Sequence, residues 1–225
     1  MTYSIKLSPR TVAILKNFAT INPSLQFKVG SVLKTISPSK TIFAHATVEE
    51  NFESEFAIYD LNKFISVLSL FNEPTLEIEE KRLRIVEDGR AATYTFADPS
   101  GLILPPNKEL KLPSIDVEFE LTQATWFAVK KAKAVLRHEE IAVTGEGGVL
   151  SIHAVDTKNP SANKFSVRIG ETDKEFEAVF KSSNIAIIDG DYTVQISSKG
   201  ISRFLAKNAT RELDYFIATE KSSKF

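Results

Sequence analysis

The sequence predicts an α+β fold in which two similar domains each combine antiparallel β-sheet with helices. Short runs rich in β-branched and aromatic residues recur along the whole chain, with turn signals such as Asp88-Gly89 and Asp189-Gly190 between them. Helical windows with apolar spacing interrupt these runs, and a proline-rich segment lies near the middle. Together these observations predict hairpin-rich sheets, a few helices and one division of the chain.

The candidate strands are spread over both halves of the chain. They lie at residues 25–36, 41–48, 55–59, 75–80, 83–86 and 91–96 in the first half, and at residues 115–120, 141–143, 149–155, 165–169, 175–180, 192–197 and 213–219 in the second. Because turn residues separate many neighbouring runs, hairpins are the simplest connection, and we expect antiparallel sheets.

Helices are expected at residues 8–20, 60–71 and 122–137, with a shorter one at residues 182–188. Ser8 suits the N-cap of the first helix because its hydroxyl can accept from a free backbone N–H, and Pro9 suits the first helical position. Asp60 suits the N-cap of the second helix for the same reason as Ser8.

The segment 98–113 separates the two halves. It contains Pro99, Pro105, Pro106 and Pro113 among leucines, an isoleucine and charged residues. This composition suits an extended connector, because proline neither continues a helix nor donates a hydrogen bond to a sheet. We place the domain boundary here, with an N-terminal domain at residues 1–110 and a C-terminal domain at residues 111–225.

The two halves resemble each other in the order of their elements. Leu7-Ser8 aligns with Leu121-Thr122, so that a hydroxyl cap opens the first helix of each half. In each half a strand end, 57–60 or 178–181, then runs into a short helix with apolar spacing, and strands follow. This order predicts one unit used twice, although two α+β domains that resemble each other by chance remain the alternative.

Composition limits the class of protein. With 225 residues and 43% hydrophobic content, the chain can bury a substantial core. The 28 Lys+Arg and 29 Asp+Glu leave a net charge of -1, so any surface for nucleic acid must be local. The absence of cysteine excludes disulfides and thiolate metal sites. Neither a signal peptide nor a membrane-spanning apolar run is visible, so we expect a soluble cytoplasmic protein without membrane contact.

The predicted helices carry cations on one side. In the window 122–137, Trp126, Lys130, Lys133 and Arg137 fall within an arc of roughly 60°, while Leu121, Ala124, Ala128, Ala132 and Val135 lie opposite. We therefore expect this helix to pack by its alanine side and to expose its cations, with Lys131 nearer the packed side.

The first two helices show a similar pattern. Their expected buried residues are Thr11, Ile14, Leu15 and Phe18 in one and Leu61, Phe64, Ile65, Leu68 and Phe71 in the other, leaving Arg10, Ala13, Lys16, Asn17, Thr20, Asn62, Lys63, Ser66 and Ser69 exposed. No acidic residue lies on these exposed faces. Carboxylates gather elsewhere, around residues 49–55, 77–80 and 171–177.

Such segregation suits contact with a phosphate backbone, which lysine and arginine bind without reading bases. The candidate DNA-binding residues are Arg10, Lys16, Lys63, Lys130, Lys131, Lys133, Arg137 and Lys181. For any single lysine, an ordinary solvated position is the alternative. The shared pattern is what favours phosphate contact.

Three segments carry a resemblance to a known family. Residues 15–22 (Leu-Lys-Asn-Phe-Ala-Thr-Ile-Asn), 57–62 (Ala-Ile-Tyr-Asp-Leu-Asn) and 97–100 (Ala-Asp-Pro-Ser) closely resemble segments of the sliding clamp of T-even-type bacteriophages. The similarity runs through much of the first domain and becomes sparse in the second. The longer N-terminus departs from the family pattern.

The resemblance implies a DNA-clamp-like fold: a closed, head-to-tail homotrimeric ring with helices lining the hole. Such a ring encircles duplex DNA and tethers the replicative DNA polymerase in the cytoplasm of the infected bacterial host. The resemblance also implies a clamp loader that opens the ring, a role in phage late transcription, and an apolar pocket for a polymerase peptide. We place the pocket at Leu102, Ile103 and Leu104. For the subunit interface we choose two candidate strand edges with Ala91, Tyr94, Phe96, Phe165, Val167 and Ile169, although both could be ordinary sheet interior.

No pattern for catalysis, metal or cofactor stands out. His45, His138 and His153 lack the spacing of a zinc motif, and we expect ordinary surface roles for them. The glycines at 145–148 do not match a phosphate-binding loop. We therefore expect a protein that is not an enzyme and needs no cofactor. The alternatives are a phage structural protein that assembles through sheet edges and, with less support, an enzyme with acidic metal ligands.

Overall fold

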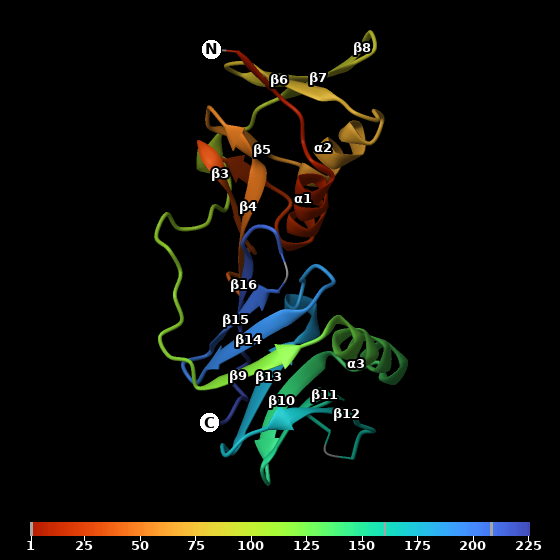
Figure 1. The fold of residues 1–225 in the computed structure, drawn as a ribbon, viewed down its shortest axis with the longest axis vertical. Coiled ribbons are helices and arrows are strands. Elements are labelled where there is room, and N and C mark those ends of the chain that lie inside the picture. The colour runs from red at the N-terminus through yellow and green to blue at the C-terminus, as the bar shows by residue number, and fades with distance from the viewer. Residues whose placement is uncertain (1, 160, 208) are drawn as a thin grey trace. The chain divides into compact units, whose positions relative to one another are not determined.

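The computed structural model describes residues 2–159, 161–207 and 209–225 (Figure 1). The chain divides into two compact units, one formed by residues 1–107 with 211–213 and the other by residues 108–210 with 214–225. The expected domains 1–110 and 111–225 remain a prediction, because a compact unit need not fold independently.

The first unit consists of short strands and two helices. In chain order its elements are β1 (Tyr3–Ile5), α1 (Pro9–Ile21), β2 (Leu25–Phe27), β3 (Gly30–Ile36), β4 (Ile42–Phe52), β5 (Phe56–Ile58), α2 (Leu61–Leu68), β6 (Thr75–Ile78), β7 (Arg82–Glu87), β8 (Arg90–Thr95) and the single turn η1 (Pro99–Gly101). The strands pair antiparallel in the order β1-β6-β7-β8, and β2 pairs with β5 and β3 with β4.

The second unit has the same texture. Its elements are β9 (Val117–Leu121), α3 (Gln123–Leu136), β10 (Glu140–Glu146), β11 (Val149–Val155), β12 (Phe165–Glu171), β13 (Phe176–Lys181), the single turn η2 (Ser182–Asn184), β14 (Tyr192–Ser197), β15 (Ile201–Ala206) and β16 (Leu213–Ala218). One antiparallel sheet runs β12-β11-β10-β13, and a second set pairs as β9-β14-β15-β16. The α+β fold with antiparallel sheets is thus confirmed.

The structure also confirms the repeated order of elements. Each half runs from a strand into a long helix, then through four strands and a short helical segment into three strands. In each half, the strand before the helix pairs with the first of these last three strands, β1 with β6 and β9 with β14. A shared order together with shared pairing is more than a chance likeness of composition would produce.

The predicted caps begin the helices. The side chains of Ser8, Asp60 and Thr122 each accept from the backbone N–H three residues on, at 3.2, 2.8 and 3.1 Å. The helix predicted at 182–188 was wrong beyond its first turn. Ile185 and Ile187 are buried, whereas Ala186 and Ile188 are only half-buried, so burial alternates along this stretch as it does in extended chain.

Each unit has its own apolar core. In the first, the ring of Phe27 stacks on that of Phe56 with centroids 4.5 Å apart. In the second, Tyr192, Val194 and Tyr215 have at most 1% of their surface exposed. Within the described residues, no helix is both long enough and apolar enough to span a membrane.

Candidate nucleic-acid interface

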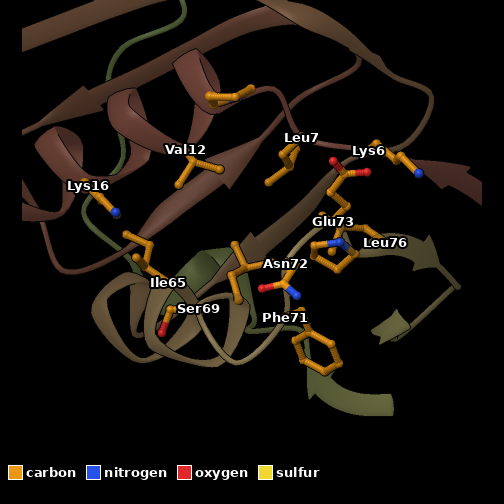
Figure 2. A pocket seen from close by; sticks show the side chains of 13 residues that line it. Lys6, Leu7, Val12, Lys16, Ile65, Ser69, Phe71, Asn72, Glu73 and Leu76 are labelled. Atoms are coloured by element: carbon orange, nitrogen blue, oxygen red, sulfur yellow. The ribbon is translucent and has the colours of Figure 1, made fainter. Parts of the chain in front are cut away.

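Helices α1 and α2 lie together in the first unit and border a groove of about 510 Å³. Figure 2 shows Val12 on α1 opposite Ile65 on α2, with Lys16 at the margin of the groove. Most of the lining is apolar, and its polar residues are Lys6, Lys16, Ser69, Asn72 and Glu73. The cation of Lys16 therefore stands beside an apolar surface at the junction of the two helices.

The predicted faces of α1 and α2 are largely confirmed. Of the predicted apolar and hydroxyl contacts, Thr11, Ile14, Leu15, Phe18, Leu61, Phe64 and Leu68 are buried. Lys16 and Lys63 are exposed, as predicted, and no acidic side chain lies within either helix. Both lysines are therefore accessible to a phosphate group.

Arg10 has a different role from the one predicted. Its Nη1 donates to the carbonyl of Thr47 at 2.7 Å, and its Nη2 donates to the carbonyl of Arg211 at 2.9 Å. Guanidinium geometry allows one side chain to serve both carbonyls at once. The expectation of an outward cation was therefore wrong for Arg10, which holds α1 against backbone of its own unit.

The packed side of α3 was also predicted wrongly. Trp126 and Val129 are the buried residues of this helix, with 2% and 0% of their surface exposed, whereas Val135 is 74% exposed. Burying a tryptophan and a valine removes more apolar area from water than burying alanines does. The helix therefore packs by the side on which Lys130 and Lys133 lie.

The cations of α3 consequently differ in exposure. Lys130 is half-buried, pairs with the carboxylate of Asp189, and holds its ammonium 5.6 Å from the centre of the Trp126 ring. Lys133 is half-buried as well, whereas Lys131 is exposed rather than turned to the packed side. Lys131 is therefore more accessible to a phosphate group than Lys130 or Lys133.

Two further candidate cations end their elements. Arg137 follows α3 in the left-handed conformation with φ 57° and is exposed, while Lys181 ends β13 and is exposed too. The left-handed conformation is typical of a helix C-cap and turns the chain away from the helix axis. Both side chains remain open to solvent.

Several of the clustered carboxylates are engaged within the first unit. Glu77 pairs with Arg84 at 2.8 Å and Glu79 with Arg82 at 2.7 Å across the β6–β7 hairpin. Glu50 is buried and accepts hydrogen bonds from the N–H of Ser8 and the hydroxyl of Thr11 at the start of α1. One acidic group thus fixes the N-terminus of a helix instead of forming part of an outer acidic surface.

The surface roles expected for two histidines were wrong. His153 is buried and hydrogen-bonded to the hydroxyls of Thr144 and Ser166, at 2.8 Å each. Burial, helped by the nearby Lys164, lowers the pKa of His153 to about 4. His138 is buried too and contacts the carbonyl of Asn163 at 2.6 Å.

Comparison with known proteins identifies the family of this fold. The family described as DNA polymerase processivity factor matches residues 6–95, and the family described as gp45 sliding clamp, C terminal, matches residues 118–221. The sliding clamp of Vibrio phage KVP40 is 36% identical over 96% of this chain and 99% of its own length. The chain belongs to the sliding-clamp family. The sliding clamp of Enterobacteria phage T4 is 29% identical over 97% of this chain and 98% of its own.

Solved structures of proteins from cellular organisms share the fold. Proliferating cellular nuclear antigen from Entamoeba histolytica matches with a TM-score of 0.72 at 11% identity, covering 97% of this clamp and 98% of that chain. A Helicobacter pylori β clamp matches with a TM-score of 0.73 at 14% identity, covering 97% of this clamp and 66% of that chain. At such identities the likeness establishes the fold, while the phage relatives establish the family.

The two runs chosen for the clamp's subunit interface lie on terminal strands of its sheets. Ala91 and Tyr94 belong to β8, at one end of the order β1-β6-β7-β8, and Phe165, Val167 and Ile169 belong to β12, at one end of β12-β11-β10-β13. Both runs thus lie at or beside sheet edges, and their role as a subunit interface stays a prediction.

Not every side chain of these edges faces outward. The hydroxyl of Tyr94 donates to the carbonyl of Asp60 at 2.9 Å, and Phe96, just beyond β8, stacks on Phe56 with centroids 4.8 Å apart. Tyr94 and Phe96 thus support their own unit. What β8 leaves available is chiefly its backbone edge.

Sequence reasoning missed an apolar surface on α3. Phe127 is 62% exposed, and Val135 helps to line a shallow hollow with Leu136 and Phe165. This hollow extends from α3 to Phe165 on β12, whereas Phe127 lines a separate hollow beside Asp189 and Asp191. The exposed apolar spacing could have been found in the sequence had the tryptophan been assigned to the packed side.

The partner pocket predicted at Leu102, Ile103 and Leu104 stays a prediction. These residues follow η1, and the carbonyl of Ile103 accepts from the side chain of Asn22 at 3.0 Å. A hollow of about 180 Å³ lies a little further along the connector. It is lined by Gln26, Lys28, Val29, Val32, Lys34, Pro105, Pro106 and Asn107. Val29 is 64% exposed, which makes it an apolar candidate that the sequence did not single out.

Proposed function

We propose that this clamp closes into a head-to-tail homotrimer around duplex DNA and tethers the replicative DNA polymerase for processive synthesis. The observation that carries the proposal is the similarity to a phage sliding clamp over 96% of the chain. In this proposal the clamp catalyses no reaction. Retention on DNA comes from ring closure, so individual DNA contacts need to be only few and weak.

The DNA contacts proposed here are phosphate contacts from exposed cations. Lys16, Lys63 and Lys131 meet that requirement best, and Arg137 and Lys181 are exposed too. Lys130 and Lys133 are secondary, since the first is paired with Asp189 and both are half-buried. Phosphate contacts carry no base information, which suits a protein that moves along any sequence.

We place the subunit interface at the β8 edge of one copy and the β12 edge of the next. Exposed apolar side chains stand near each edge: Leu70, which is 67% exposed, ahead of β6 in the first unit, and Val135 beside Phe165 in the second. A heterologous interface of this kind joins different surfaces and closes into a ring when the rotation between copies allows it. The apolar residues would add burial to the backbone hydrogen bonds.

For the polymerase we propose an apolar peptide segment bound at the connector, with Leu102, Ile103 and Leu104 on one side and Val29 and Val32 on the other. A clamp loader would open the ring, and the same pocket would serve partners in late transcription inside the infected host cell. Val29 and Val32 are 64% and 41% exposed, so a partner can reach them.

The test is retention on DNA of different topology. The clamp is loaded onto a nicked circular plasmid, and its release is followed before and after the plasmid is cut once. Solution mass is measured in parallel by light scattering. We expect a trimeric mass, retention on the circle and rapid loss from the cut molecule.

A charge-reversal variant supplies the control for the DNA surface. Lys16→Glu, at an exposed position on α1, should reduce retention on the circle while the trimeric mass is kept. Equal release from circular and cut DNA would contradict encirclement, and a monomeric mass at all concentrations would contradict the ring.

A further inference from the structure

The last described residues of the chain cover the outer edge of β13. Glu177 exchanges two backbone hydrogen bonds of 2.8 Å with Lys224 in an antiparallel bridge. The carbonyl of Val179 accepts from the N–H of Glu220 at 2.7 Å, and the N–H of Val179 donates to the hydroxyl of Ser223 at 3.0 Å. The edge-directed backbone groups of Glu177 and Val179 are therefore all satisfied by residues 220–225.

An aromatic pair holds the end of this segment. The ring of Phe225 stacks on that of Phe176, with centroids 5.9 Å apart and planes 5° from parallel. Phe176, the first residue of β13, is buried, whereas Phe225 remains 48% exposed. The segment is thus anchored along the strand, yet it lies at the surface.

The opposite edge of the same sheet is uncovered. Among the residues that the structure describes, β12 forms strand hydrogen bonds only with β11; β9 lies near it but does not pair with it. An uncovered strand edge presents unpaired N–H and C=O groups and is a template for another strand. One sheet thus combines an open edge with a covered one.

Strand directions show what would follow if both edges were open. Because β12, β11, β10 and β13 are antiparallel in succession, β13 runs opposite to β12. A second copy placed by simple translation would then set its β12 antiparallel to the β13 of the first. Contacts that repeat by translation do not close, and they produce open-ended fibres.

We propose that residues 220–225 are an edge cover, and that the β13 edge beneath them is a latent surface for the β12 edge of a second copy. The proposal rests on the proposed ring only in that the cover leaves β12 free for the β8 edge. The cover thereby directs assembly toward closure and away from open-ended growth.

The decisive comparison is Lys224→Pro against Lys224→Ala. Proline removes the N–H that donates to Glu177, while alanine keeps it and removes the same side chain. Mass is measured by light scattering over a series of protein concentrations, together with a chain ending at residue 219. For Lys224→Pro and the shortened chain we expect a mass that rises with concentration without a plateau. The parent chain and Lys224→Ala should keep one mass.

Circular dichroism and amide hydrogen exchange show whether unfolding, rather than an opened strand edge, causes the rise in mass. The amides of Glu177 and Val179 should exchange faster in Lys224→Pro while the rest of the sheet stays protected. Phe225→Ala, which leaves the four hydrogen bonds in place, is a milder variant, and its mass should rise less with concentration than that of Lys224→Pro. A peptide of residues 219–225 added to Lys224→Pro should reduce its mass, whereas the same peptide with proline at 224 should not.

The proposal is overturned if Lys224→Pro exposes the Glu177 amide, keeps its fold and retains the parent mass. If the shortened chain unfolds, the test rests on the mass of Lys224→Pro and on the effect of adding the peptide to it. A monomeric parent chain would contradict the ring of the proposed function. It would leave this comparison intact, because growth is judged against the parent's own mass.

Discussion

The ammonium of Lys130 forms an ion pair with the carboxylate of Asp189, on the loop that leads into β14. The same ammonium lies over the ring of Trp126, the most deeply packed aromatic residue of α3. A cation held in this way is partly neutralised before any DNA arrives. The position of a lysine on a helix is therefore a poor guide to its availability.

This pairing predicts an effect of Asp189→Asn on DNA binding. Without the carboxylate, Lys130 would be free to meet a phosphate, and the slope of log affinity against log salt should steepen by about one. The measurement is affinity for a linear duplex over a salt series. Lys131→Glu should lower affinity at every salt concentration and more than Lys130→Glu does; the reverse order would place DNA on the packed side of α3.

Arg10 is predicted to affect stability rather than DNA binding. Arg10→Ala leaves the carbonyls of Thr47 and Arg211 without their donor and should lower the free energy of unfolding by about 1–3 kcal/mol. Urea unfolding followed by circular dichroism measures this change. Lys16→Ala, on the exposed side of α1, is the control and should cost less than about 0.5 kcal/mol. Equal losses for the two variants would contradict the assignment.

Glu50 is predicted to stabilise the start of α1. Glu50→Gln keeps the shape but replaces a carboxylate that accepts from two donors by a neutral amide with one oxygen. That oxygen can still accept from the N–H of Ser8, but the hydroxyl of Thr11 loses its charged acceptor. We expect a loss of about 1–3 kcal/mol in urea unfolding. Glu49→Gln, at an exposed neighbouring position, should change little. A neutral Glu50→Gln would mean that the carboxylate does not hold the helix.

His153 predicts a dependence of stability on pH. Its pKa is lowered to about 4 in the folded chain, so below its ordinary value near 6.5 the unfolded chain binds the proton first. The stability that comes from a neutral His153 is complete above about pH 6.5 and is lost as the pH falls toward 4, by up to about 3 kcal/mol. Thermal unfolding between these pH values should show the loss.

The matched variant for His153 is His153→Gln, which keeps a polar side chain but does not titrate. It should flatten this part of the pH profile even if its stability at neutral pH is lower. An equally steep profile in His153→Gln would assign the effect to other groups, such as carboxylates.

The parts of the fold that were predictable depend on local chemistry. The caps at Ser8 and Asp60 act through side chains that accept from nearby backbone, so short-range sequence determines where the helices begin. The order of elements in the two halves follows from the same local signals. The β12 edge, by contrast, is an edge only because of how distant strands pair, which no local pattern contains.

The candidate site was only partly predictable. An angular plot assigns Trp126 and Lys130 to one side of α3 but does not tell which side packs. The large indole decides this: Trp126 is buried, and the ammonium of Lys130 lies over its ring. Arg10 escaped prediction for a related reason, because its partners are backbone carbonyls remote in sequence.

The difference between α2 and η2 breaks the equivalence of the two halves. Where the first half has a helix with the exposed Lys63, the second has a single turn that follows Lys181. A duplex turning inside a ring of such copies would feel an electrostatic potential that repeats with each copy and not with each half. Rotation of the clamp about the DNA axis would then have preferred angles, one for each copy in the ring.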